Sequence, residues 1–229
     1  MLAWARVGVV YRVAAFDVAE PAPLLTALLT EVAATLVTMG PGGLESTIVP
    51  LIFDPAPGEL GTLVGHVARG NPIVRHVLAG EALVVVTGAA GYITPSWYAS
   101  KAEDGKVVPT WDYVTVQAAG PLTVHDDPAW VLNVVTRLTE RHEASFGTPW
   151  AVSDAPEEYV AAMLRGIVGI EIPITRLAGK AKLSQNRPSA DQDGVLAGLQ
   201  ALGGPAPSAA TALANAITAA RAGAQPEPG

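Results

Sequence analysis

His66 is the side chain whose type and sequence context best suit the ligation of a metal or a haem. It lies in the segment LVGHVARGNP, at the end of an expected strand and just before an expected short helix that starts at Pro72. A neutral imidazole can bind a metal ion or a haem iron when its other nitrogen is held by a carbonyl or carboxylate, and the nearby Arg69 could pair with an anionic group of a cofactor. The alternative is a histidine that is hydrogen-bonded within the fold.

A second candidate region is the aromatic segment 92–113, YITPSWYASKAEDGKVVPTWDY. Large aromatic side chains bury an apolar body, and those of Tyr and Trp also need a partner for the O–H or N–H group. These properties suit the wall of a half-polar cavity, and they equally suit a rigid corner of the core. The residues that could form such a wall are Trp97, Tyr98, Trp111 and Tyr113.

The third candidate region is the polar segment 179–188, GKAKLSQNRP. Its ammonium, amide and guanidinium groups offer several hydrogen-bond donors to an anion such as a phosphate or a propionate. A solvated strand end is the competing interpretation. The donors are Lys180, Lys182, Gln185, Asn186 and Arg187.

The other histidines are less suited to a site. His142 lies on a charged helical face, His125 precedes a helix start, and His76 belongs to a short amphipathic segment, so we expect none of the three to be a ligand. The sequence contains no HExxH, GxSxG, Walker or GxGxxG pattern. This argues against hydrolase, nucleotide triphosphatase and Rossmann-type functions.

Composition restricts the class of protein further. A chain of 229 residues, half of them apolar, can bury a substantial core, and the absence of cysteine excludes disulfides and thiolate metal sites. The net charge of −7, with 14 basic residues spread along the chain, does not favour nucleic acid as a partner. We find neither a signal-peptide pattern nor an apolar run of the ~20 residues that span a bilayer, and so expect a cytoplasmic protein without a membrane partner.

Periodicity predicts the elements that position these residues. Helices are expected at 21–31, after Asp126-Asp127-Pro128, and after Asp154-Ala155-Pro156-Glu157, which resembles a capping box. Strands are expected at 34–38, 44–53, 61–68, 82–87, 107–117, 121–125 and 170–184. The predicted class is α+β, mostly antiparallel, with peripheral helices. We expect one domain over 1–200 and an Ala/Pro/Gly-rich tail over 201–229, in which 208–221 has helix propensity.

Six segments in the order of the chain resemble the PaiB-type family of FMN-binding negative transcriptional regulators. They are GHVARGNP (65–72), GYITPSWYASK (91–101), VPTWDY (108–113), TPW with DAPEEY (148–159), IVGIEI (167–172) and KLSQNRP (182–188). The resemblance runs from about Tyr11 to Leu199. It implies a split β-barrel of the FMN-binding type and a homodimer that holds a flat cofactor near the subunit interface.

The same family contains haem-dependent piperazate synthases, which close N5-hydroxyornithine into a cyclic hydrazine by forming an N–N bond. The segments YRV (11–13), EVA (31–33) and IVP (48–50) depart from the regulator pattern, and so does Asp112, where regulators commonly have asparagine. Without polar groups at Val32, Ala33 and Ile48 the expected cavity is more apolar, which suits a porphyrin better than the hydrogen-bonding edge of an isoalloxazine.

The subgroup resemblance implies a haem-dependent cyclase of antibiotic biosynthesis, with haem b as cofactor and a small amino acid as substrate. His66 would bind the iron and leave the opposite face to the substrate. Asp112 would hold the substrate ammonium, and Tyr98 would take part in catalysis. The cofactor-binding residues on this interpretation are His66, Arg69, Trp97, Trp111, Tyr113, Lys182 and Arg187.

Two alternatives on the same fold stay open. In an FMN-binding regulator, Lys182, Gln185 and Arg187 would bind the flavin phosphate, and the protein would sense a signal without catalysing a reaction. The other alternative is a flavin-dependent reductase or oxidase. In both cases FMN takes the place of haem.

Overall fold

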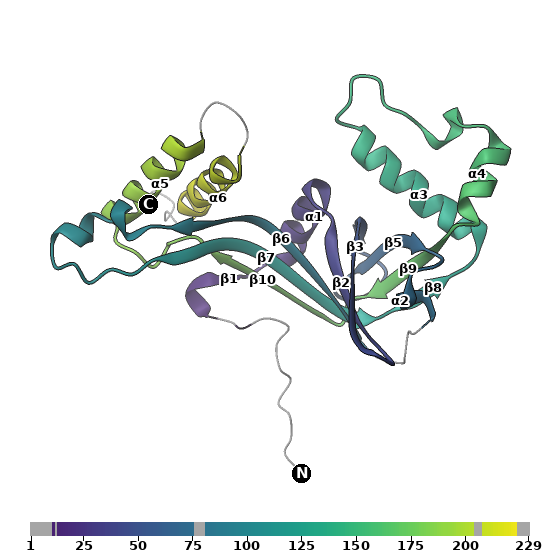
Figure 1. Cartoon of the computed structure of the whole chain (residues 1–229), viewed down its shortest axis with the longest axis horizontal. Coiled ribbons are helices and arrows are strands. Elements are labelled where there is room, and N and C mark those ends of the chain that lie inside the picture. The colour runs from purple at the N-terminus through teal and green to yellow at the C-terminus, as the bar shows by residue number, and fades with distance from the viewer. Residues whose placement is uncertain (1–10, 12, 76–80, 204–207, 224–229) are drawn as a thin grey trace, which may run out of the picture. The chain divides into compact units, whose positions relative to one another are not determined.

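The computed structural model describes residues 11, 13–75, 81–203 and 208–223 (Figure 1). Its strands are β1 (Asp17–Val18), β2 (Ala34–Gly40), β3 (Gly43–Val49), β4 (Leu51–Asp54), β5 (Thr62–Ala68), β6 (Glu81–Ile93), β7 (Thr110–Pro121), β8 (Thr123–His125), β9 (Ile167–Pro173) and β10 (Arg176–Lys182). The helices are α1 (Pro21–Glu31), α2 (Pro72–Arg75), α3 (Pro128–Glu143), α4 (Glu157–Leu164), α5 (Ser189–Gly203) and α6 (Ala209–Gly223). Short 3-10 helices are η1 (Ala14–Phe16), η2 (Pro95–Trp97), η3 (Ala99–Ala102) and η4 (Val152–Asp154).

The strands form two sheets. One has the order β1-β10-β7-β6-β2-β3 and the other the order β4-β5-β9-β8. The pairs β1–β10, β2–β3 and β2–β6 in the first sheet and β4–β5, β5–β9 and β8–β9 in the second are antiparallel. The predicted α+β class with mostly antiparallel pairing is therefore confirmed.

Prolines divide two of the expected strands. The strand expected at 44–53 is broken at Pro50, so that β3 and β4 belong to different sheets, and the strand expected at 170–184 is broken after Pro173 into β9 and β10. Proline has no N–H to donate to a neighbouring strand, which makes it a natural boundary between strands. The expectation of two continuous strands was wrong for this reason.

The predicted helices are present, but only one of the two predicted N-terminal caps is. Asp127 Oδ1 accepts a hydrogen bond from Ala129 N at 3.1 Å, so the predicted cap of α3 is confirmed. The capping box expected at α4 is wrong, because Asp154 Oδ2 instead accepts a hydrogen bond from Ala151 N at 2.9 Å and thereby caps η4. The helix predicted at 208–221 is confirmed as α6.

By their internal contacts the described residues divide into two compact units. Unit 1 comprises residues 20–86 and 116–178, and unit 2 comprises 11–19, 87–115 and 179–223, each with the gaps stated above. Strands β6, β7 and β10 each contribute residues to both units. The boundary expected between residues 200 and 201 stays a prediction.

In unit 1, helix α3 covers one face of the four-stranded sheet (Figure 1). The core under this helix is apolar: Ile52 and Val64 of the sheet pack with Val134 and Leu138 of α3, and Trp130 packs against the cluster. Helix α1 packs on β4 and buries Leu25, Leu28 and Leu29.

In unit 2, helices α5 and α6 form a pair that packs on the segment after β6 (Figure 1). Two glycines of α5 make room for Trp97 of η2, because a Cβ at Gly194 would collide with the Trp97 carbonyl and a Cβ at Gly198 with its indole ring. On α6, the buried Leu213 approaches Gly91 of β6. The aromatic segment 92–113 is therefore held by the C-terminal helices.

Candidate functional site

Asp112 of β7 carries a completely buried carboxyl group. Ser184 Oγ donates to its Oδ2 at 2.6 Å, and Lys182 Nζ lies 3.8 Å from its Oδ1. Oδ1 accepts no hydrogen bond from the described residues. Burial raises the pKa of Asp112, and the Ser184 hydrogen bond and the Lys182 charge oppose that rise. The side chain is thus a buried acid with one unused acceptor.

Lys182 joins this acid to the backbone of β7. Its Nζ donates to Trp111 O at 2.7 Å and also to Thr110 Oγ1. Ser184 has a φ of 59°, a left-handed conformation that is uncommon outside glycine and that often occurs at functional sites. We call Thr110, Asp112, Lys182 and Ser184 the Asp112 network; it ties the end of β10 to the start of β7.

Tyr98 and Arg187 form a second contact in unit 2. The Arg187 guanidinium carbon lies 4.5 Å from the centroid of the Tyr98 ring, within cation–π distance. Tyr98 is buried, and its hydroxyl has no hydrogen-bond partner among the described residues. Burial raises the pKa of Tyr98, and the positive charge of Arg187 works against that rise.

Lys180 of β10 is a nearly buried ammonium group, with only 6% of the residue exposed. Its Nζ donates to Tyr11 O at 3.3 Å and lies 5.3 Å from the Tyr11 ring centroid and 5.5 Å from that of Tyr113. None of the ion pairs among the described residues includes Lys180. The groups that contact its ammonium are a carbonyl and two aromatic faces, and Asp17 of β1 lies opposite Lys180 in the strand register.

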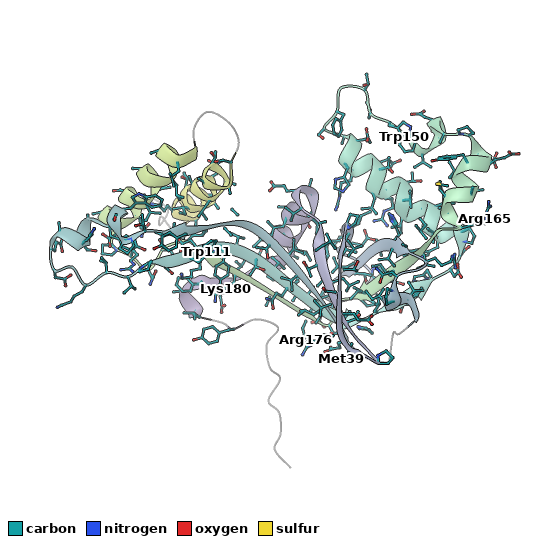
Figure 2. All side chains as sticks on the ribbon, in the orientation of Figure 1. Met39, Trp111, Trp150, Arg165, Arg176 and Lys180 are labelled. Atoms are coloured by element: carbon teal, nitrogen blue, oxygen red, sulfur yellow. The ribbon has the colours of Figure 1, made fainter. Side chains whose placement is uncertain are left out.

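An exposed aromatic pair lies in the same unit. Trp111 is 55% exposed and Tyr92 52% exposed, and their ring centroids are 6.4 Å apart in an edge-to-face arrangement. Figure 2 labels Trp111, which comes from β7, and Lys180, which comes from β10. Large apolar rings left this open to solvent are candidates for contact with a flat ligand.

His66 lies in β5 of unit 1, on the sheet face that α3 covers. It is paired in register with Gly169 of β9, which is in turn paired with His125 of β8, so all three positions point to one face. The indole of Trp130 fills the space above Gly169 and stacks on the His125 ring, with 4.1 Å between the ring centroids. His66 Nδ1 is buried and has no partner among the described residues, and burial lowers the pKa of His66.

The glycine before His66 does not open a space for a ligand. A Cβ at Gly65 would come within 2.6 Å of Leu51 Cδ2 and 2.8 Å of Pro50 O, so the neighbouring strand occupies that volume. His125 Nε2 lies 2.6 Å from Glu171 Oε2, which together with the stacking on Trp130 explains this histidine as a structural residue. His76 lies outside the described residues.

Every nitrogen of the Arg69 guanidinium donates to a protein acceptor, and 43% of the side chain remains exposed. It forms two hydrogen bonds with Asp126, at 2.7 and 2.6 Å, and also donates to Arg165 O at 2.8 Å and Ile167 O at 3.2 Å. These contacts join the end of β5 to the start of α3 and to the turn before β9. They border a cavity of about 270 Å³, whose walls do not include His66.

The residues predicted from the sequence fall into two groups. Unit 2 holds the Asp112 network, the Tyr98–Arg187 contact and the rings of Trp97, Trp111 and Tyr113, whereas unit 1 holds His66 and Arg69. Their roles in catalysis or cofactor binding stay predictions. Sequence reasoning did not single out Ser184, nor Asp191, whose buried carboxylate accepts hydrogen bonds from Ser100 N at 2.9 Å and Ser100 Oγ at 2.8 Å.

The described residues contain no group of three or more His, Cys, Asp or Glu side chains placed to hold a metal ion. None of their helices combines the length and the apolar character needed to cross a bilayer.

Comparisons with known sequences identify relatives over most of the chain. Residues 10–176 match the model of a family described as "Putative FMN-binding domain". The chain is 35% identical over 193 residues to an uncharacterized protein of Emericella nidulans, covering 70% of this chain and 76% of that protein. It is 31% identical over 167 residues to the protease synthase and sporulation protein PAI 2 of Bacillus subtilis, covering 72% and 77%.

Solved structures show the same fold at low identity. The FAD and haem binding protein from Mycobacterium smegmatis superposes with a TM-score of 0.53 at 17% identity, covering 80% of each chain. The flavocytochrome Anf3 from Azotobacter vinelandii also gives 0.53, at 11% identity, covering 75% of this chain and 72% of that one. The predicted split-barrel class is confirmed by this likeness, which at such identities concerns the fold alone.

Proposed function

The chain belongs to the PaiB-type family of FMN-binding domains, and on this basis we propose that it binds FMN in unit 2, at the ends of β7 and β10. This choice differs from the haem-dependent cyclase that the sequence favoured. It rests mainly on one observation, the nearly buried Lys180 ammonium, which takes part in none of the ion pairs among the described residues.

A buried charge is costly unless a partner of opposite charge accompanies it. A phosphate group would supply that partner, and Lys182 lies two residues further along the same strand. Three neighbouring groups fix Lys182, namely Thr110 Oγ1, Trp111 O and the Asp112 carboxyl, so its ammonium is held in place before a ligand arrives. Both lysines lie beyond residue 176, where the family match ends.

The exposed rings suit the other end of FMN. Trp111 and Tyr92 offer a large apolar surface on which an isoalloxazine ring could stack, and Tyr113 lies next to the Lys180 ammonium. When bound, FMN supplies one- and two-electron redox chemistry. The residues of unit 2 bind and orient it, and Arg187 remains a second candidate for the phosphate.

The test compares FMN with riboflavin, which lacks the phosphate. We expect FMN to bind more tightly to the full chain, and Lys180→Met to lower the affinity for FMN by about tenfold or more, since a hydrogen bond to a charged group contributes about 1.5–3 kcal/mol. Riboflavin affinity should change little. The matched control is Lys106→Met, which removes the same charge from an exposed loop lysine. Equal affinity for FMN and riboflavin would contradict the proposal.

A second candidate is the haem-dependent cyclase, and His66 is the observation that favours it. Its buried Nδ1 has no described partner, and its lowered pKa keeps the imidazole neutral, as a metal ligand must be. Bound haem would supply a Lewis-acidic iron for N–O activation. On this proposal haem supply during expression gives a Soret band that His66→Ala removes; a Soret band unchanged in that variant would contradict it.

We also propose that the protein is a cytoplasmic homodimer. The edge strand β3 and its neighbour β2 expose the apolar side chains of Met39, Leu44 and Ile48, and Met39 is paired with Leu44 in register. Monomeric proteins normally protect an edge strand with charges or a covering element. A second copy of the chain would cover these side chains.

A small-molecule substrate or signal is the expected partner, and the net charge of −7 does not favour direct binding of nucleic acid.

A further inference from the structure

A cavity of about 510 Å³ lies in unit 1 between α3 and the η4–α4 segment. Leu132, Thr136 and Glu140 follow one another at four-residue intervals on α3 and so form one stripe along the helix. Val152 and Val160 line the cavity from the other side. The volume is within the range of about 300–1,000 Å³ that is usual for small-molecule sites.

The wall opposite α3 is fixed by its own hydrogen bonds. Glu143 Oε2 of α3 accepts a hydrogen bond from Trp150 N at 2.9 Å, and Asp154 Oδ2 accepts one from Ala151 N, also at 2.9 Å. Ala155 N then donates to Val152 O at 3.3 Å. The first bond ties the segment to α3 and the other two fix its local conformation, so this wall of the cavity is formed before a ligand binds, which lowers the entropy cost of binding.

The charged side chains that line the cavity are all acidic. Glu140 and Glu157 line it, no basic side chain does, and neither carboxylate takes part in an ion pair among the described residues. A cation is therefore the complementary ligand. The described residues contain no cluster of three metal ligands, and the rest of the lining is mainly apolar, so an organic cation fits better than a metal ion.

We propose that this cavity binds a small organic ammonium compound with an apolar chain. The ammonium group pairs with Glu140 and Glu157, and the chain lies along Leu132, Val152 and Val160. This site shares no residue with the proposed flavin site, so the two proposals can fail separately.

Ligand-observed NMR on the full chain tests the proposal with three probes of equal chain length: hexylammonium, hexan-1-ol and hexanoate. We expect hexylammonium to bind most tightly and hexanoate most weakly. Glu140→Gln combined with Glu157→Gln should lower hexylammonium affinity about fivefold, because exposed ion pairs contribute about 0.2–1 kcal/mol each. Hexanol affinity should not change.

The matched control is Glu103→Gln combined with Glu158→Gln, which removes the same net charge from exposed positions that do not line the cavity. We expect this variant to bind hexylammonium as the parent does.

Val160→Trp should fill the cavity and abolish binding of every probe. A circular-dichroism spectrum like that of the parent is the check on folding. Equal binding of the three probes, equal losses in the two double variants, or no binding of hexylammonium would overturn the proposal.

Discussion

Asp112 and Lys180 are both buried ionisable residues of unit 2, but their surroundings differ. Asp112 has Ser184 and Lys182 as partners, whereas Lys180 has a carbonyl and two aromatic rings. The pKa of Asp112 is nevertheless raised, because burial has a larger effect than its two partners. Its ionised form is therefore disfavoured in the folded protein.

This raised pKa predicts how Asp112 affects stability at different pH. The folded state binds the proton of Asp112 more tightly than the unfolded state does, so its contribution is most favourable at pH below the ordinary Asp pKa of 3.8. It declines as the pH rises through the raised pKa. Asp112→Asn does not titrate, so its free energy of unfolding relative to the parent should rise as the pH increases above the ordinary Asp pKa of 3.8.

Urea denaturation of both proteins across this pH range measures the difference. The control is Asp104→Asn, which changes an exposed loop carboxylate outside the Asp112 network. Asparagine also alters the contact with Lys182, and this adds an offset that does not depend on the Asp112 proton. A difference for Asp112→Asn that falls with pH would contradict the raised pKa.

Residue types, but not their partners, could be predicted from the sequence. The donors of the segment 179–188 and the aromatic residues of 92–113 were identified because their side-chain chemistry is local information. The contact between Asp112 and Ser184 joins residues 72 positions apart, so it depends on how β7 and β10 are aligned. The partner of Arg69 was likewise unpredictable, because Asp126 meets it only after β5 and α3 pack together.

Helix α5 gives the clearest prediction for a secondary-structure element. Gly198→Ala should destabilise the protein by about 1–3 kcal/mol, because the added Cβ collides with the Trp97 ring. An exposed helix position would instead gain about 1 kcal/mol from the same substitution. Thermal or urea unfolding measures the change, and loss of α5 packing should also alter the fluorescence of Trp97.

A double variant separates the collision from other causes. In Trp97→Leu the smaller side chain leaves room at α5, so adding Gly198→Ala to it should cost much less than in the parent. Ala197→Leu, at an exposed neighbouring position of α5, is the control and should be close to neutral. A Gly198→Ala protein at least as stable as the parent would show that Trp97 does not pack on this helix.

Most elements could be predicted from periodicity and start signals, and the two errors in the strands have a common cause. Pro50 and Pro173 each lie within a continuous apolar pattern. For this reason β3 and β4 were predicted as one strand, and so were β9 and β10, although the two members of each pair belong to different sheets. The pattern reports which residues are buried, but not which sheet buries them. Asp154 caps η4 and not α4, because a single aspartate can serve either of two adjacent helix starts.

For the whole molecule, we predict that the protein is a dimer in solution and that the exposed face of β2 and β3 forms the interface. Leu44 is 74% exposed in the single chain, and Leu44→Glu should give a monomer by light scattering after gel filtration, because it places a charge in an apolar contact. The control Leu202→Glu changes a similarly exposed leucine of α5. A wild-type monomer, or a Leu44→Glu protein that remains dimeric, would contradict this interface.

The identity of the cofactor is the central question for the whole molecule, and an absorption spectrum addresses it directly. The protein should be expressed with riboflavin and a haem precursor in the medium, purified as the full chain, and then titrated with FMN. We predict the two absorption bands of bound flavin, with release of FMN on denaturation and reduced FMN retention in Lys180→Met. A Soret band without flavin, together with no uptake of added FMN, would contradict the proposal that unit 2 binds this nucleotide.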